Sequence, residues 1–181
     1  LENYQTKAQV FIETGKTKFL NGDCVVVSNG TQTADFTYDL SKQLFSTDTP
    51  IQITSNLTAF YPKKYFDSLT DGAINITLPQ EQAYIAGKVE DAPMAGSWNG
   101  KLFTFKNLCS IIRFDIPANE AVKKIEFTSN NATLSGPATI HSNTLTMTGP
   151  GTKTISVSIP EGFTPDKNKP ICVVVPSQTY A

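Results

Sequence analysis

The sequence has very few of the side chains from which catalytic and nucleic-acid-binding sites are built. Of its 181 residues, His141 is the only histidine and Arg113 the only arginine. With 15 basic and 16 acidic side chains the formal charge is -1, so no long-range field recruits nucleic acid or an anionic membrane. The guanidinium group is also the preferred group for phosphate recognition. We therefore expect no nucleic-acid partner.

Long apolar runs are missing as well. The longest, residues 24–27 and 171–175, fall far short of the roughly 20 apolar residues that a membrane helix needs. We therefore expect no transmembrane segment. The chain begins at Leu1 with neither a basic nor an apolar leader region. We expect that any export signal has been removed or never belonged to this chain.

The cysteines fit no metal or redox motif. Cys24, Cys109 and Cys172 each lie in an apolar, strand-like run. Three is an odd number, and the spacings match neither a zinc ribbon nor a CxxC pair. Two interpretations stay open: buried free thiols that act as small apolar residues, or one disulfide with a thiol left over. We expect no metal and no cofactor.

Catalytic patterns are equally weak, and we expect the protein not to be an enzyme. His141 has no nucleophile motif such as GxSxG to accompany it, so a strand-end histidine that faces water is favoured. Residues 67–72 lack the alternating oxygen ligands of a calcium loop and are typical of a turn. Nothing selects a catalytic pair from the acids in polar connectors, which are Glu81, Glu90, Asp91 and Glu120.

The sequence does contain a repeated alternation of apolar and polar side chains, with a period of two residues. In residues 33–40 the apolar side chains alternate with threonine and aspartate, and residues 152–159 repeat the pattern. One buried and one wet face is the mark of an antiparallel sheet. The remaining predicted strands are residues 8–13, 51–54, 57–61, 73–78, 102–106, 110–116, 122–128, 138–141, 144–148 and 171–175.

Turn sequences separate these strands, and only residues 80–86 suggest a helical turn or two. Short strands at close spacing predict an all-β antiparallel sandwich. Residues 87–100 are polar and contain Gly and Pro, which is typical of a linker. We therefore predict two small sandwiches, residues 1–99 and 100–181. The second half is short, so either that domain is incomplete or the whole chain is one larger sandwich.

Several short motifs occur in a definite order. They are Leu78-Pro79-Gln80 with Gln82, DAPMA at 91–95, FTFKNL at 103–108 leading into IIRF at 111–114, and a weaker VVVPSQ at 173–178. Together they resemble the fimbrillin-like proteins that Gram-negative anaerobes secrete to build surface pili. The resemblance implies two tandem transthyretin-like, Greek-key sandwiches. It also implies a structural or adhesive pilus subunit that assembles by β-strand addition.

That resemblance implies partners and a location. The partners are other pilin subunits and a protein or glycan on a host or bacterial surface. The location is the fimbrium outside the cell, with outer-membrane anchoring through an N-terminal lipid signal that has been lost. The strand-exchange segment would contain Ala8, Val10, Phe11 and Ile12. No arginine precedes Arg113, which departs from pilins that arginine-specific proteases mature.

A second function class remains, a monomeric secreted carbohydrate-binding or adhesin module. Exposed aromatic rings stack on sugars, and Tyr61, Tyr65 and Trp98 are the candidate surface contacts. The alternative is that these rings pack strand ends against a loop. The apolar run at 171–175 likewise has two interpretations, an ordinary core strand or a strand that inserts elsewhere.

Overall fold

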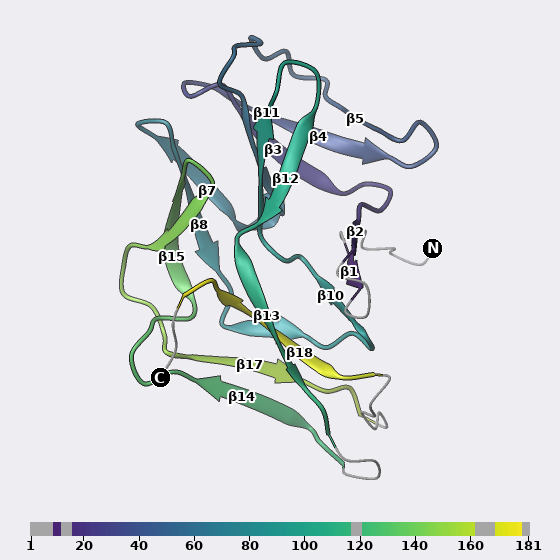
Figure 1. Ribbon diagram of the computed structural model, residues 1–181, viewed down its shortest axis with the longest axis vertical. Coiled ribbons are helices and arrows are strands. Elements are labelled where there is room, and N and C mark those ends of the chain that lie inside the picture. Colours follow the sequence, from purple (N-terminus) through teal and green to yellow (C-terminus); the bar gives the residue numbers. More distant parts are fainter. Residues whose placement is uncertain (1–8, 12–15, 117–120, 162–168, 179–181) are drawn as a thin grey trace.

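The computed structural model describes residues 9–11, 16–116, 121–161 and 169–178, with the backbone alone for 9–11 and 16. These residues form β-strands and one 3-10 turn, Lys63–Tyr65. Among the described strand pairs, β9 with β17 is parallel and the others are antiparallel. The predicted all-β class is therefore confirmed. Figure 1 shows an elongated molecule with sheets in an upper and a lower part.

The largest sheet forms much of the upper part. It has six strands in the order β12-β11-β6-β3-β4-β5, so β11 lies in its interior. Alternating apolar residues allow this sheet to bury side chains on both of its faces. The strands are β3 (Cys24–Ser28), β4 (Thr33–Asp39), β5 (Leu44–Ser46), β6 (Thr58–Tyr61), β11 (Met94–Trp98) and β12 (Phe103–Asn107).

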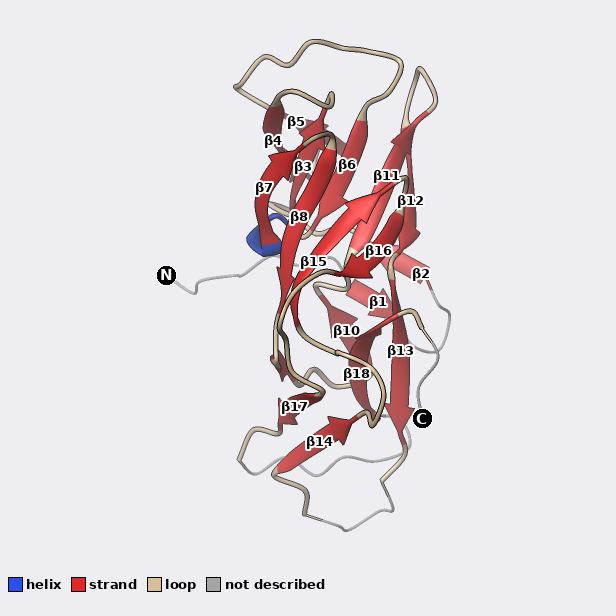
Figure 2. Ribbon diagram, turned by 90° about the vertical axis from the view of Figure 1, so that its left-hand side faces the viewer, coloured by secondary structure: helices blue, strands red, loops and turns tan. Residues whose placement is uncertain are grey.

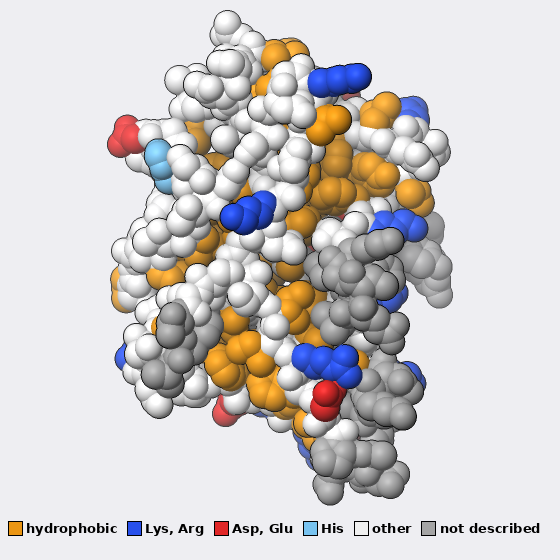
Figure 3. All heavy atoms as spheres, in the orientation of Figure 1, with side chains coloured by type: hydrophobic (Ala, Val, Ile, Leu, Met, Phe, Trp, Pro, Cys, Tyr) orange, Lys and Arg blue, Asp and Glu red, His pale blue; other side chains and the backbone are white. Residues whose placement is uncertain are grey.

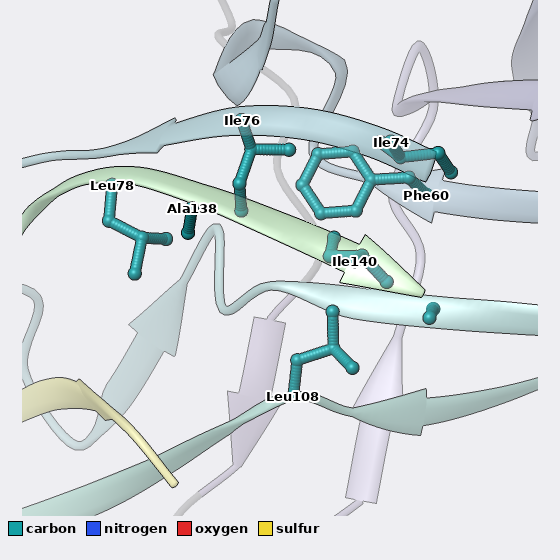
Figure 4. Close-up of a cluster of buried hydrophobic side chains, with 8 residues drawn as sticks. Phe60, Ile74, Ile76, Leu78, Leu108, Ala138 and Ile140 are labelled. Atoms are coloured by element: carbon teal, nitrogen blue, oxygen red, sulfur yellow. The ribbon is translucent and has the colours of Figure 1, made fainter. Parts of the chain in front are cut away.

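A four-stranded sheet in the order β16-β15-β8-β7 packs against one face of the six-stranded sheet. Their shared core contains Phe60 and Ala95 from the larger sheet and Ile76 and Ile140 from the smaller one, as Figure 4 shows for three of them. This is sandwich packing of two sheets. The smaller sheet consists of β7 (Phe66–Thr70), β8 (Ala73–Leu78), β15 (Gly136–His141) and β16 (Thr144–Met147).

The lower part contains three small sheets. In the first, β17 (Thr154–Ser158) pairs with β14 (Lys124–Thr128) and β9 (Glu81–Ala83). In the second, β13 (Cys109–Phe114) pairs with β18 (Ile171–Pro176). In the third, β1 (Gln9–Phe11) lies between β10 (Lys88–Glu90) and β2 (Lys16–Lys18). Figure 2 shows β13 and β18 together beside β10.

Among the chain segments that join the upper part to the lower part, two are very short. Strand β12 is followed by β13 after Leu108 alone, and β8 is followed by β9 after Pro79 and Gln80. Figure 1 shows β12 running down into β13 along the long axis. Leu108 and Leu78 are both buried in the upper core. Each connection is therefore anchored by an apolar side chain where it leaves the upper sheets.

The second face of the six-stranded sheet carries a separate aromatic cluster. Phe19 lies at its centre, with ring centroids 5.0 Å from Phe45, 5.3 Å from Phe105 and 5.6 Å from Tyr61. These are edge-on contacts, the arrangement that aromatic quadrupoles favour. The cluster therefore covers much of this face with side chains from the sheet itself and from the loop that holds Phe19.

Most predicted strands are present, but three expectations were wrong. Residues 51–54 form no strand, and Ile53 is 73% exposed. Residues 81–83 are strand β9 rather than part of a helical turn. Residues 87–100 are not a linker, because they hold β10 and the interior strand β11. These residues pair in sheets, and sheet pairing overrides the local polar, Gly- and Pro-containing composition.

The predicted domain boundary near residue 99 lies in the turn between β11 and β12, which pair with each other. Strand β8 also pairs with β15, and β9 with β17, so three strand pairs join residues from either side of position 99. The division into residues 1–99 and 100–181 stays a prediction, as does the Greek-key order.

Candidate functional site

The candidate strand-exchange segment lies partly within the described residues. Val10 and Phe11 belong to β1, where Val10 is opposite Val89 of β10 and Thr17 of β2. Ala8 and Ile12 lie outside the described residues. The backbone of β1 therefore occupies the middle position of its three-stranded sheet, and removing it would expose the paired edge of β10.

Strand β18 is buried on both faces. Ile171, Val173 and Val175 each have 0% exposure and pack in the core that joins β18 to β14 and β17. Alternate residues of a strand point to opposite faces. Accordingly, Cys172 and Val174 pack on the other side with Val89 of β10. Of the two interpretations for residues 171–175, the structure shows a core strand.

Only one edge of β18 is paired with another strand in the described part of the chain. That partner is β13, in a continuous antiparallel register from Cys109 to Phe114. On the other edge, the side chain of Gln82 bonds to the backbone of Val174. The Val174 N–H donates to Gln82 Oε1 at 2.8 Å, and Gln82 Nε2 donates to the Val174 carbonyl at 2.7 Å.

The direction of these two bonds identifies the open edge. In an antiparallel pair, residues alternate between those that bond to the partner strand and those whose N–H and C=O point away from it. Since Val174 directs both groups to Gln82, Cys172 directs its N–H and C=O to the same side. This unusual combination, a strand buried on both faces but with a side chain in place of one neighbouring strand, defines an acceptor edge.

A cavity of about 190 Å³ lies beside this edge. Cys172, Val174 and Pro176 of β18 line it together with Gln82 and Val89. Figure 3 shows apolar side chains exposed between polar ones in the lower half of the molecule. The remaining lining residues are Lys64, Tyr65, Leu78, Pro79, Glu81, Ala83, Ile85, Lys88, Glu90, Asp91, Pro93, Cys109 and Leu134.

A polar chain begins at the cavity wall, where Lys64 and Asp91 are lining residues. Lys64 Nζ donates to Asp91, a residue only 8% exposed, and the Tyr61 hydroxyl lies 3.2 Å from Asp91 Oδ1. The same hydroxyl lies 3.4 Å from Asp23 Oδ1, while Asp23 Oδ2 accepts the Leu20 N–H at 2.6 Å. Both buried carboxylates are thus hydrogen-bonded, as burial requires.

Two titratable groups of the cavity wall, Cys109 and Tyr65, are held in their neutral forms. Burial raises the pKa of the Cys109 thiol to about 12. Burial, and after it the negative charge of Asp91, raises the pKa of Tyr65. A thiol with so high a pKa forms little thiolate near neutral pH and is a poor nucleophile. The cavity therefore offers hydrogen-bonding and apolar contacts rather than an activated nucleophile.

The three predicted surface aromatics do not form one platform. Tyr61 is 2% exposed, so its ring belongs to the core and cannot contact a ligand at the surface. Trp98 is half-buried, with its ring centroid 5.1 Å from that of Phe103. Tyr65 packs at the edge of the other upper core, with Lys64 Nζ 5.0 Å from its ring centroid. Tyr61 and Trp98 thus share one cluster, and Tyr65 lies elsewhere.

The other candidates from the sequence are a histidine and three cysteines. His141 is exposed at the end of β15, as predicted, with Nδ1 3.2 Å from the Ser142 hydroxyl. Cys24, Cys109 and Cys172 are free thiols, which excludes the interpretation with one disulfide. In the described ranges, no group of three or more His, Cys, Asp or Glu side chains could hold a metal ion.

Sequence reasoning did not identify Gln82 as a functional residue, although it quoted the motif Leu78-Pro79-Gln80 with Gln82. The structure gives three parts of the motif distinct roles. Leu78 is in the upper core, the Gln80 carbonyl accepts the Ser156 N–H at 2.9 Å, and the Gln82 side chain holds Val174. The signal available in the sequence was a glutamine close to an apolar strand. Such a glutamine does not indicate which distant backbone groups its side chain will contact.

Fold and site together define a layered all-β protein in which β18, among the described residues, pairs with a strand on one edge only and lies beside a cavity of about 190 Å³. No protein-family model, no curated protein and no solved structure matches this chain. None of the helical segments in the described ranges has the length and apolar character needed to cross a membrane.

Proposed function

We propose that this protein is a structural or adhesive subunit of a cell-surface pilus, and that copies assemble by β-strand addition. The observation that carries the proposal is the acceptor edge of β18. An added strand would bond to the main-chain groups of Cys172 and Val174 and place its side chains among apolar residues that already exist there.

The occupant that we propose is an extended segment from a second copy of this chain. Strand β1 supplies the reason, because it occupies one edge of β10, where the described residues pair at three positions. Val89 of β10 lines the same cavity as Val174 of β18. Loss of the N-terminal segment with Val10 and Phe11 would therefore open the paired edge of β10, a strand whose Val89 packs with Cys172 of β18. We place this assembly outside the cell, with other pilin subunits and a surface protein or glycan as partners.

The test is assembly after removal of the N-terminal segment. Three forms are compared by size-exclusion chromatography with light scattering: the full chain, a variant that lacks residues 1–13, and a control variant that lacks residues 1–6. We expect a ladder of oligomers from the variant without residues 1–13 and monomers from the other two. A stable monomer from all three would contradict strand-exchange assembly.

A carbohydrate-binding module is the second candidate, and the exposure of Trp98 supports it. This ring lies at the end of β11 beside Phe103, and Leu102 in the adjacent turn is 51% exposed. Trp98 is the only tryptophan of the chain, so its fluorescence reports this place alone. Saturable quenching or enhancement of this fluorescence by a glycan would favour this candidate.

A further inference from the structure

The cavity beside β18 lies where the upper and the lower sheets meet. Tyr65 of the 3-10 turn and Leu78 at the end of β8 line it, and both side chains also pack in the upper core. From the lower sheets, Val89 of β10 and Val174 of β18 complete the apolar part of the wall together with Leu134. Ligand cavities in proteins often lie at such junctions between packed units.

The volume of the cavity is suited to a single ring. At about 190 Å³ it is somewhat larger than an apolar cavity of roughly 150 Å³, which holds one benzene molecule. A six-membered ring with a short substituent would therefore fill it. The ring would contact the side chains of Val89, Leu134 and Val174.

One hydrogen-bond donor of the wall has no protein partner. In the described part of the chain, the Tyr65 hydroxyl makes no hydrogen bond. Burial, and after it the charges of Asp91 and Cys109, raises the pKa of this hydroxyl. Since Asp91 and Cys109 both line the cavity, the hydroxyl lies close to the cavity wall. It can therefore donate to a molecule inside the cavity.

The other uncharged wall residue with a strong hydrogen-bonding side chain is Gln82. Its amide is already bonded to the N–H and the C=O of Val174. The Tyr65 hydroxyl is thus the side-chain donor that the wall offers to an acceptor atom of a ligand.

The charges around the cavity disfavour an anion. The charged lining side chains are three carboxylates and two ammonium groups, Glu81, Glu90, Asp91, Lys64 and Lys88. Lys64 is already paired with Asp91. The negative charge of Asp91, which disfavours the tyrosinate form of Tyr65, would also repel a carboxylate placed beside that hydroxyl. A fitting ligand is therefore neutral.

We propose that this cavity binds a small, neutral ring compound that carries one hydrogen-bond-accepting oxygen, and that the Tyr65 hydroxyl donates to that oxygen. The ring lies among the apolar side chains of the wall, and the oxygen lies at the Tyr65 end. The lining residues all belong to one chain, so the site does not depend on assembly by strand addition.

The experiment is an NMR titration of the full chain with three probes that share a phenyl ring. Acetophenone carries a carbonyl oxygen, α-methylstyrene has a CH₂ group in its place, and benzoate carries a negative charge. Methyl resonances of Val89 and Val174 report on the cavity, and those of Val25 in the aromatic cluster are the control. We expect acetophenone to shift Val89 and Val174 saturably, with Val25 unchanged, and benzoate to cause no saturable shift.

Tyr65→Phe tests the hydrogen bond. Because the hydroxyl bonds to no residue in the described ranges, this substitution removes the donor without breaking an internal hydrogen bond there. We expect it to weaken acetophenone binding about threefold to tenfold, the factor of one neutral hydrogen bond, and to leave α-methylstyrene binding unchanged. The matched control is Tyr38→Phe, in the aromatic cluster outside the cavity, which should keep the parent affinity for both probes.

The outcomes that would overturn the proposal are distinct. If acetophenone does not shift Val89 and Val174 up to its solubility limit, the cavity is not a site for this class of ligand. Benzoate that binds as tightly as acetophenone would overturn the neutral class. Equal affinity changes for acetophenone and α-methylstyrene in Tyr65→Phe, or no change for either, would overturn the role of the Tyr65 hydroxyl.

Discussion

Cys109 and Tyr65 make the stability of the protein sensitive to alkaline pH. Both groups line the cavity beside β18, and both have a raised pKa because burial disfavours their charged forms. The folded state therefore holds these protons more tightly than the unfolded state, in which an ordinary thiol has a pKa of 9.0. Their contribution to stability is complete below the unfolded pKa and is lost as the pH rises.

We expect the free energy of unfolding to fall as the pH rises from about 9 towards 12, by on the order of a few kcal/mol from Cys109. In Cys109→Ala the fall should be smaller, because Tyr65, the other thiols and the lysines still titrate but Cys109 no longer does. Urea unfolding at several pH values measures both slopes, and the constant effect of the smaller side chain cancels in the comparison. Equal slopes for the two proteins would contradict the assignment to Cys109.

The burial of individual polar residues could not be predicted from the sequence. Asp23 and Asp91 stand next to glycine or alanine in turn-like contexts, where aspartate is normally solvated. Their burial depends on the Tyr61 hydroxyl, which comes from a strand far away in the sequence. The same long-range packing placed Tyr61 in the core, against its predicted role as a surface ring.

Strand β11 shows why one element of the fold was missed. Its sequence Met-Ala-Gly-Ser-Trp contains no β-branched residue, so local propensity does not favour a strand. Its position between β6 and β12 instead requires small side chains. A Cβ atom at Gly96 would lie 3.1 Å from the Cβ of Ala59 and 3.1 Å from the ring of Phe105.

We expect Gly96→Val to lower the free energy of unfolding by about 1–3 kcal/mol or more, because the added carbons must push apart Ala59 and the Phe105 ring. Thr104→Val on β12 is the matched control, since Thr104 is exposed and accepts a similar volume without a clash. Urea unfolding followed by circular dichroism measures both. Gly96→Val as stable as the control would show that the sheet adjusts freely there.

The strands that were predicted correctly share a feature that β11 lacks. Strands β4, β8 and β17 have clear alternation or β-branched residues, and their bounds lie within two residues of the predicted ones. By contrast, β9 and β10 have three residues each, too few to show a period. The acceptor edge could be predicted only in part: residues 171–175 were recognised as apolar on both faces, but which strands pair with β18 among the described residues depends on the whole topology.

On the scale of the whole molecule, the first and second halves of the sequence contribute strands to the same sheets. Strand β8 from the first half pairs with β15 from the second, and their shared core includes Leu108. The first half alone would leave β8 and β11 without β15 and β12. Cooperative folding of the complete chain is the expectation from this arrangement.

We therefore expect the separate fragments 1–99 and 100–181 to lack cooperative urea unfolding, and an equimolar mixture to regain the circular dichroism of the intact chain. The reason is that the upper core needs Ile76 from one fragment and Ile140 from the other. The intact chain is the reference, and each fragment alone is the control for the mixture. A cooperative transition from fragment 1–99 alone would instead support the predicted division at residue 99.

The two shortest connections between the upper and the lower part have a mechanical consequence. Both β12–β13 and β8–β9 run from the upper to the lower sheets with very few intervening residues, and β12–β13 follows the long axis in Figure 1. A tensile load along that axis would pull the β11–β12 and β13–β18 ladders in shear, so that many hydrogen bonds resist together. Under such a load the force along these two connections would pass through hydrogen-bonded ladders rather than through a long loop.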